Sequence, residues 1–263
     1  MPHNLSPFSS QFSPSPAARH YHPTLSIWLS VDPMSDKYPS TSPYTYCANN
    51  PIVLKDPNGR EIGDFFSMNG KYLGNDGNSD DKVYLIGSRK DIKLIRKNYK
   101  NGEATQCDKV TIRLQTTKQV VSKIKEVSDR LYKNNGFCEE GASVFPDGTS
   151  VDYPQGPDAR YTEDGKGHLY LFDKYERDGS GVLIHGHPIG EWNDMIWPVD
   201  PNLDEADKKA ALQNSMTVII GKTREDFAGE RHDVVRFYDK DGERITTISR
   251  NSLLNINAYY SAQ

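Results

Sequence analysis

The chain has few cysteines, no long apolar run and no excess of positive charge. Cys47, Cys107 and Cys138 are odd in number, widely spaced and without a Cys-x-x-Cys pair, so neither a disulfide framework nor a cysteine-rich zinc site is expected. No stretch approaches the roughly 18 apolar residues that span a bilayer, and no signal peptide is recognisable at the start. The formal net charge of −4 over 263 residues gives no general attraction for nucleic acid, so nucleic acid is not a favoured partner.

Composition changes along the chain. Residues 1–17 are dominated by Ser and Pro and show no periodicity, which predicts disorder because such a segment buries too little apolar surface. Residues 25–62 alternate short apolar pieces with Asp-Pro, Ser-Pro and Asn-Pro turn signals, which predicts short strands joined by tight turns. Such a segment is too small to be stable alone. Residues 63–263 are expected to form one α/β or α+β domain.

The segment ARHYHPTLSIWLSVDPMSDKYPSTSPYTYCANNPIVLKDPNGRE, residues 18–61, resembles the C-terminal core motif of RHS/YD-repeat proteins. In that family the motif closes a large β-shell, and a variable toxin domain follows it. The resemblance implies that residues 18–62 are a remnant of the shell and that residues 63–263 are the C-terminal toxin or effector domain. It also implies a secreted or cell-surface-delivered effector with a cognate immunity protein as partner.

The match departs from the family pattern at two places. His22 stands before Pro23, where the family has Asp. The family's self-cleavage aspartates would correspond to Asp32 and Asp56, but the Gly-Leu that follows in the family is incomplete in both motifs. Self-release after Arg60 is one interpretation, and the other is that both Asp-Pro pairs are simply turn formers.

One long amphipathic helix is predicted in TTKQVVSKIKEVSDRLYKNNG. Its apolar residues recur at spacings of four, three and four, at Val120, Ile124, Val127 and Leu131. Thr116 or Thr117 would be the N-cap, and residues 134–136 would end the helix. The basic segment RKDIKLIRKNYK, around residues 90–100, is interpreted as a solvated helix or turn face.

Strands are predicted around this helix from short apolar stretches bounded by polar residues. In chain order they cover residues 109–114, 138–145, 168–173, 182–185, 216–221, 234–238 and 244–249. A second helix is predicted at about residues 204–214.

The apolar run at residues 182–185 leads into His-Gly-His-Pro, the most informative motif of the chain. Side chains at i and i+2 of a strand point to the same side, so His185 and His187 can both present a nitrogen to one metal ion. A catalytic zinc takes three protein ligands at about 2.0–2.1 Å and leaves one position open. Asp207, in the first turn of a helix capped by Asp204, is the predicted third ligand.

A zinc-activated water also needs a carboxylate that takes its proton without binding the metal. Glu139 and Glu140 are candidates at the start of the strand that follows the long helix, and only one of two adjacent strand residues can face the site. Other ligand candidates remain open in the loop and at the helix start: Asp194, Asp200 and Glu205, the last in a pairing with Asn202.

The order Glu, then HxHP, then a helix-start Asp resembles the JAB/MPN (JAMM) metalloprotease signature. The resemblance implies a mixed sheet with flanking helices over about residues 116–250, and a protein or peptide substrate. It implies zinc bound by His185, His187 and Asp207. The water-activating glutamate would be Glu140, with Glu139 as the alternate.

The family's oxyanion-assisting serine is replaced here. Asp204 takes that position, and an ionised carboxylate cannot donate a hydrogen bond to a developing oxyanion. The interval between His187 and Asp207 is also longer than the family's usual one, so residues 190–202 would be an insertion.

The function expected from the sequence is a zinc-dependent peptidase or isopeptidase carried as the C-terminal effector of an RHS-family toxin. Two alternatives belong to other classes. A metal-dependent nuclease toxin could also use paired histidines and acids, and a non-catalytic domain could keep the JAB/MPN fold as an interaction module.

Overall fold

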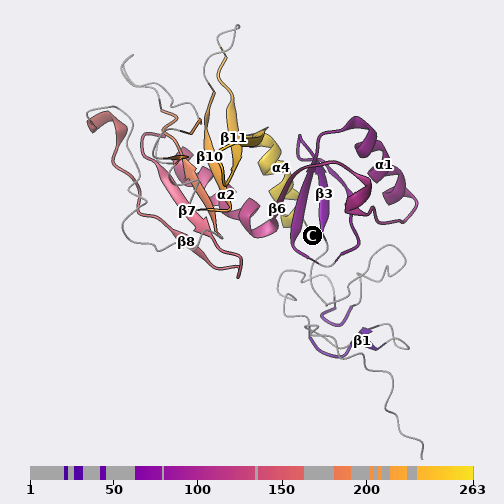
Figure 1. Cartoon of the computed structure of the whole chain (residues 1–263). Coiled ribbons are helices and arrows are strands. Elements are labelled where there is room, and N and C mark those ends of the chain that lie inside the picture. Colours follow the sequence, from indigo (N-terminus) through magenta and orange to yellow (C-terminus); the bar gives the residue numbers. More distant parts are fainter. Residues whose placement is uncertain are drawn as a thin grey trace, which may run out of the picture.

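The computed structural model describes residues 21–22, 27–31, 42–45, 63–78, 80–133, 136–162, 181–190, 202–203, 207–208, 214–223 and 230–262. Within these residues the protein is mixed α/β, with two mixed sheets, a separate two-stranded pair and three α-helices (Figure 1). None of the described helices is long and apolar enough to cross a membrane.

The smaller mixed sheet has the strand order β4-β3-β5-β6. Its strands are β3 (Asp64–Ser67), β4 (Tyr72–Asn75), β5 (Lys82–Ile86) and β6 (Ile112–Thr117). Strands β3 and β5 are parallel, and the other pairs are antiparallel. Helix α1 (Arg89–Lys100) follows β5, and its buried Ile95 joins Phe65, Leu73, Tyr84 and Ile86 in a small core.

The larger mixed sheet has the order β12-β11-β10-β9-β7-β8. Its strands are β7 (Glu140–Val144), β8 (Ser150–Asp152), β9 (Val182–Gly186), β10 (Met216–Lys222), β11 (Asp233–Asp239) and β12 (Arg244–Ser249). Strands β9 and β10 are parallel and the remaining neighbours are antiparallel. Strands β7 and β9, which carry Glu140 and His185 of the predicted metal site, therefore lie side by side in the sheet.

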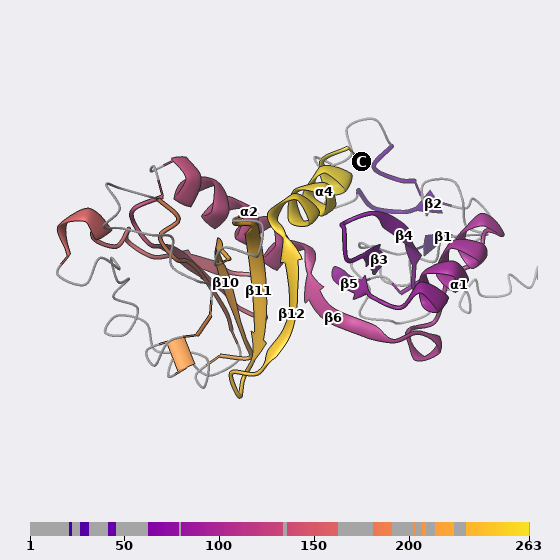
Figure 2. The ribbon, with the colours of Figure 1, turned by 90° about the horizontal axis from the view of Figure 1, so that it is seen from above.

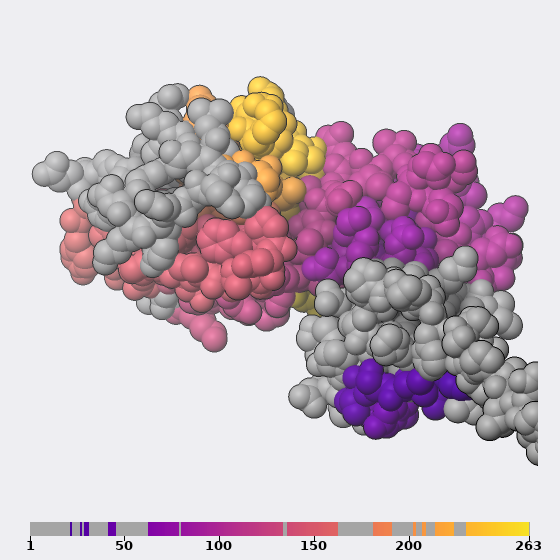
Figure 3. Space-filling model, turned by 60° about the horizontal axis from the view of Figure 1, so that its bottom comes forward, coloured from indigo at the N-terminus to yellow at the C-terminus, as the bar shows by residue number. Residues whose placement is uncertain are grey.

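Helices α2 (Lys118–Lys133) and α4 (Arg250–Ser261) join the two sheets. One hydrophobic cluster contains side chains from both helices, from β5 and β6 of the small sheet, and from β7 and β9–β12 of the large sheet. Figure 2 shows the small sheet and α1 at one end of the molecule and the large sheet at the other, and in Figure 3 the purple and magenta atoms lie on one side and the salmon and orange atoms on the other. Because α2 and α4 share this core with both sheets, the two ends form one packed unit.

The predicted long helix is confirmed. Helix α2 begins at Lys118, and the Thr117 side-chain oxygen accepts a hydrogen bond from the Val120 backbone N–H at 3.2 Å, as an N-cap does. The helix ends at Lys133, and Gly136 has a φ of +73°, a backbone conformation that favours glycine. The basic segment at residues 90–100 is also helical, as α1.

The predicted strands at 138–145, 182–185, 216–221, 234–238 and 244–249 are confirmed as β7, β9, β10, β11 and β12. The strand predicted at 109–114 is shifted, because Cys107–Lys109 form a 3-10 turn and pairing with β5 continues to Thr117. The strand predicted at 168–173 lies outside the described residues, as does most of the helix predicted at 204–214.

Little of the N-terminal 62 residues is described, and residues 1–17 lie wholly outside. Strands β1 (Tyr21–His22) and β2 (Ile27–Trp28) form an antiparallel pair, and Thr45 makes a single bridge to Ile27. These short strands agree with the predicted strand-and-turn segment. Asp32, Asp56 and Arg60 lie outside the described residues.

Candidate metal centre

His185 of strand β9 and His187, which directly follows the strand, lie on the face of the sheet that points away from α2. A Cβ atom added to Gly186 would lie 2.7 Å from Leu131 Cδ2 of α2, so the intervening residue faces the helix. Side chains alternate along a strand, and His185 and His187 therefore share the other face. Both are buried, with 1% and 4% exposure. The predicted placement of the pair is confirmed.

Asp207 meets this pair from a distant part of the chain. It has a helical backbone and is buried. Its Oδ1 lies 3.1 Å from His185 Nε2, and its Oδ2 lies 3.3 Å from His187 Nε2. The two Nε2 atoms are 3.1 Å apart. Within the described residues, these three form the group whose donor atoms could hold a metal ion.

These separations fit one small cation. Two ligand atoms about 2.0–2.1 Å from a tetrahedral zinc lie roughly 3.3–3.4 Å from each other. The two Nε2 atoms are 3.1 Å apart, and each lies 3.1 or 3.3 Å from a different oxygen of the Asp207 carboxylate, which are separations close to that value. A set of two imidazoles and one carboxylate is also a typical catalytic zinc site. A metal can therefore be held here, although the geometry does not select zinc over other divalent ions.

The electrostatics of the cluster also favour a cation. Burial raises the pKa of Asp207, but the charge and hydrogen bonds of His185 and His187 lower it more, so its pKa lies well below the usual value. The buried carboxylate is thus ionised beside two imidazole nitrogens that face each other. At 3.1 Å one imidazole Nε2 can donate a hydrogen bond to the other when a single proton is shared, and both atoms can bind a cation when neither carries a proton.

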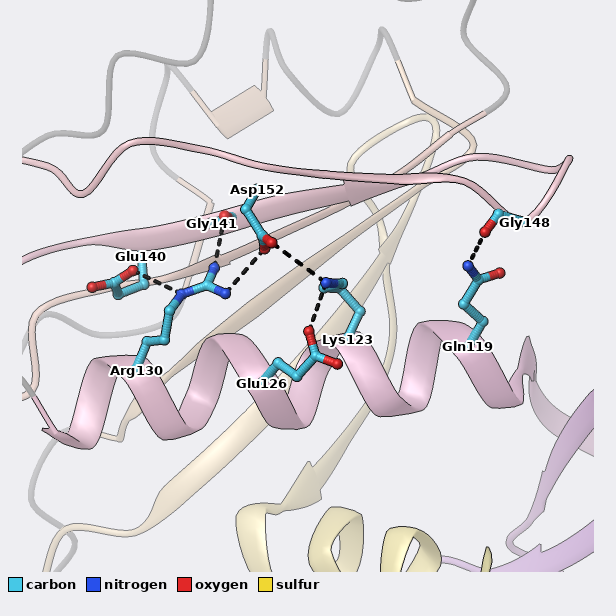
Figure 4. A network of polar contacts seen from close by, with 8 residues as sticks. All are labelled: Gln119, Lys123, Glu126, Arg130, Glu140, Gly141, Gly148 and Asp152. Carbon is cyan, nitrogen blue, oxygen red and sulfur yellow. Dashed lines mark hydrogen bonds and ion pairs between the residues drawn. The ribbon is translucent and has the colours of Figure 1, made fainter. Parts of the chain in front are cut away.

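Strand pairing separates the two candidate glutamates. Glu140 of β7 lies directly opposite Gly186 of β9, and Gly141 lies opposite His185. Residues directly opposite each other point to the same face. Glu140 therefore points toward α2, where Arg130 Nε donates to its Oε2 at 3.0 Å and Gln155 Nε2 donates to its Oε1 at 2.8 Å (Figure 4 shows Glu140 beside Arg130). The structure does not bring Glu140 to the histidines.

Glu139 precedes β7 by one residue, so alternation places it on the opposite face from Glu140. That face is the one shared by Gly141 and His185. Glu139 is buried, with 8% exposure, and its backbone carbonyl accepts a hydrogen bond from the Gly156 N–H at 3.0 Å. Of the two adjacent glutamates, Glu139 is the one that the sheet directs to the histidine side.

The remaining candidates at this site lie mostly in segments that the structure does not describe. Asp204, Asp194, Asp200 and Glu205 are outside the described residues. Asn202 is described, and its Oδ1 accepts a hydrogen bond from Arg236 Nη1 at 2.6 Å. Asn202 is thus engaged with the large sheet.

Arg130 is a residue that the sequence analysis did not single out. Beyond its bond to Glu140, its Nη2 donates to the Gly141 carbonyl and its Nη1 donates to Asp152 Oδ1, each at 3.0 Å (Figure 4). It therefore fixes β7 and β8 to α2 directly behind the candidate metal centre. In the sequence, Arg130 stands next to Leu131 of the helix's apolar stripe. This position does not reveal which residues Arg130 contacts.

Comparison with known proteins adds no family assignment. No family model, curated protein or solved structure matches the chain. The case for a function therefore depends on the chain's own residues.

Proposed function

We propose that the chain carries a zinc-dependent peptidase or isopeptidase of JAB/MPN type. The observation that carries the proposal is the convergence of His185, His187 and Asp207 in one buried cluster. A helix, a glutamate, HxHP and a helical aspartate follow one another in the order that this family's signature requires. The mixed sheet flanked by helices is compatible with such a fold.

The chain's residues would divide the work as follows. His185, His187 and Asp207 would hold the ion. Zinc would supply Lewis acidity, which lowers the pKa of water to about 7 and polarises a carbonyl oxygen. Glu139 would accept the proton of the attacking water at a carboxylate oxygen and deliver it to the leaving amine as the C–N bond breaks.

The proposed biological setting follows from the N-terminal segment. Its resemblance to the RHS core motif supports an effector that is delivered outside the producing cell and from which a cognate immunity protein protects the producer. The described β1–β2 pair is compatible with a shell remnant.

Hydrolysis of mixed peptide pools tests the activity directly. The purified chain would be incubated with peptides and with isopeptide-linked peptides, and products read by mass spectrometry. We expect cleavage that stops on chelation, returns on addition of zinc and is lost in Asp207→Asn. Metal-dependent digestion of RNA or DNA without any peptide cleavage would overturn the proposal in favour of a nuclease.

A further inference from the structure

Helix α1 carries a concentrated positive face. Its twelve residues include one acid, the buried Asp91, and six basic side chains, which are Arg89, Lys90, Lys93, Arg96, Lys97 and Lys100. At about 100° of rotation per residue, all six fall within an arc of about 120°. Asp91 and Ile95 lie on the other side and are buried against the small sheet. The basic arc is therefore the solvent face of α1.

These six charges are not neutralised by their neighbours. All six side chains are exposed, and none forms an ion pair with another residue in the described part of the chain. Like charges three and four positions apart destabilise a helix, and this face repeats that spacing from Arg89 to Lys100. Such a face is consistent with a polyanion that removes the repulsion when it binds.

Charge is also divided between the two ends of the molecule. Residues 63–117 contain ten Lys and Arg and seven Asp and Glu, a net charge of +3, whereas the whole chain has −4. Three of those seven acids, Asp64, Asp76 and Asp91, are buried. The net charge alone disfavoured nucleic acid, but it conceals a basic end.

The composition of the basic face favours one of three kinds of polyanionic partner, which are a protein, a membrane and nucleic acid. A protein interface is usually centred on apolar and aromatic residues with few charges, and no apolar residue lies within the basic arc. Membrane insertion would need exposed apolar side chains, but Ile92 and Ile95 pack against the small core. Nucleic-acid interfaces are more polar and more positive than protein interfaces, and this pattern fits them best.

We propose that the basic face of α1 binds the phosphate backbone of nucleic acid without reading its sequence. The face extends about 16 Å from Arg89 to Lys100, at 1.5 Å per residue. That length spans roughly five phosphates at about 3.4 Å per strand charge. Lys93, Arg96, Lys97 and Lys100 line a shallow hollow of about 360 Å³.

This binding surface is separate from the candidate metal centre. Figures 1 and 2 show α1 at the end of the molecule opposite the β7–β10 strands. The surface therefore does not depend on the proposed peptidase activity, and it can be tested without metal.

The proposal is tested by measuring binding of a labelled 20-nucleotide single-stranded RNA of mixed sequence by fluorescence anisotropy. A chelator is present, so that no metal contributes. For four or five contacted phosphates, we expect the logarithm of the association constant to fall with the logarithm of the salt concentration with a slope of about −3. Lys93→Gln/Lys97→Gln should weaken binding at least tenfold at 50 mM salt and flatten the slope by about 1.4. Lys133→Gln/Lys240→Gln removes the same charge from exposed positions elsewhere and should change affinity less than twofold.

Three outcomes would overturn the proposal. The first is no binding of this RNA or of a 20-base-pair DNA at 50 mM salt. The second is an equal loss in both double variants, which would show that net charge alone matters. The third is binding to phosphatidylserine vesicles or polyglutamate that exceeds binding to RNA. Because none of these readouts involves peptide cleavage, failure here is distinguishable from failure of the peptidase proposal.

Discussion

The two faces of the β7–β9 strand pair each receive one of two adjacent glutamates, and the two glutamates have different roles. Toward α2, Glu140 is held by Arg130 and Gln155, and Gly186 makes room for Leu131. On the other face, His185 and His187 meet Asp207, and Glu139 is directed to the same side. Two adjacent glutamates are thereby separated by strand alternation alone. Glu140 is placed to stabilise the fold, and alternation directs Glu139 toward the face that carries the candidate metal centre.

The largest expected effect separates the two glutamates. Glu139→Gln removes the proposed proton carrier, so kcat should fall by about 10²- to 10⁴-fold, with bound zinc unchanged. Glu140→Gln should keep kcat within a few-fold and should instead lower the free energy of unfolding. Peptide-cleavage kinetics and denaturant unfolding of both variants provide the measurements.

Glu139→Gln and Glu140→Gln make the same isosteric change at adjacent positions, so each variant serves as the control for the other. A large loss of kcat in Glu140→Gln with a normal rate in Glu139→Gln would reverse the assignment of the two faces.

The next largest effect concerns the clamp behind the site. Arg130→Ala removes the guanidinium from the buried Glu140 carboxylate, to which Gln155 still donates a hydrogen bond. Breaking a buried pair costs about 3–5 kcal/mol, and about 2–3 kcal/mol is expected here because Arg130 is partly exposed. Urea unfolding measures this loss, and Lys133→Ala at an exposed position of the same helix is the control. A loss equal to that of the control would show that the clamp contributes nothing.

A smaller effect is expected from the glycine between the histidines. Gly186→Ala places a methyl group 2.7 Å from Leu131 Cδ2 in a packed core, which should destabilise the fold by about 1–2 kcal/mol. Thermal unfolding in chelator measures the change without the metal. The double variant with Leu131→Ala tests the cause. Shortening Leu131 should relieve the clash, so the losses of the two single variants should not add. An additive double variant would contradict it.

The smallest effect lies on the histidine face, where the Ser143 hydroxyl and the Tyr153 hydroxyl are 2.5 Å apart and buried. Tyr153→Phe leaves Ser143 without this partner and should lower the free energy of unfolding by about 1 kcal/mol. Zinc content should stay unchanged, because neither hydroxyl belongs to the proposed ligand set. Loss of zinc in this variant would show that the ligand set is incomplete.

Local patterns were sufficient to predict some of these features and insufficient for others. The apolar spacing of Val120 to Leu131 and the Thr117 cap are properties of adjacent residues, and α2 follows them. The HxH spacing likewise predicts two imidazoles on one face of any strand. Asp207 was predicted as the third ligand from its position at a helix start and from the order of a family signature, and neither contains the long-range folding that brings it to the histidines.

The choice between Glu139 and Glu140 required the register of β7 against β9, which no local pattern contains. Helix α4 was not predicted because its asparagines are weak helix formers. It is stabilised by contacts far along the chain, where Leu253 and Ile256 enter the shared core and Tyr259 stacks on Tyr72. The charge of α1 was noted, but its solvent face became a candidate surface only once its buried side was known.

Zinc content per chain tests the central claim most directly. Elemental analysis after zinc loading and dialysis should give about one zinc per wild-type chain and per Glu140→Gln chain, and near zero for His187→Ala at unchanged secondary structure by circular dichroism. Equal zinc in the wild-type and His187→Ala chains, or none in either, would contradict a metal centre formed by His185, His187 and Asp207.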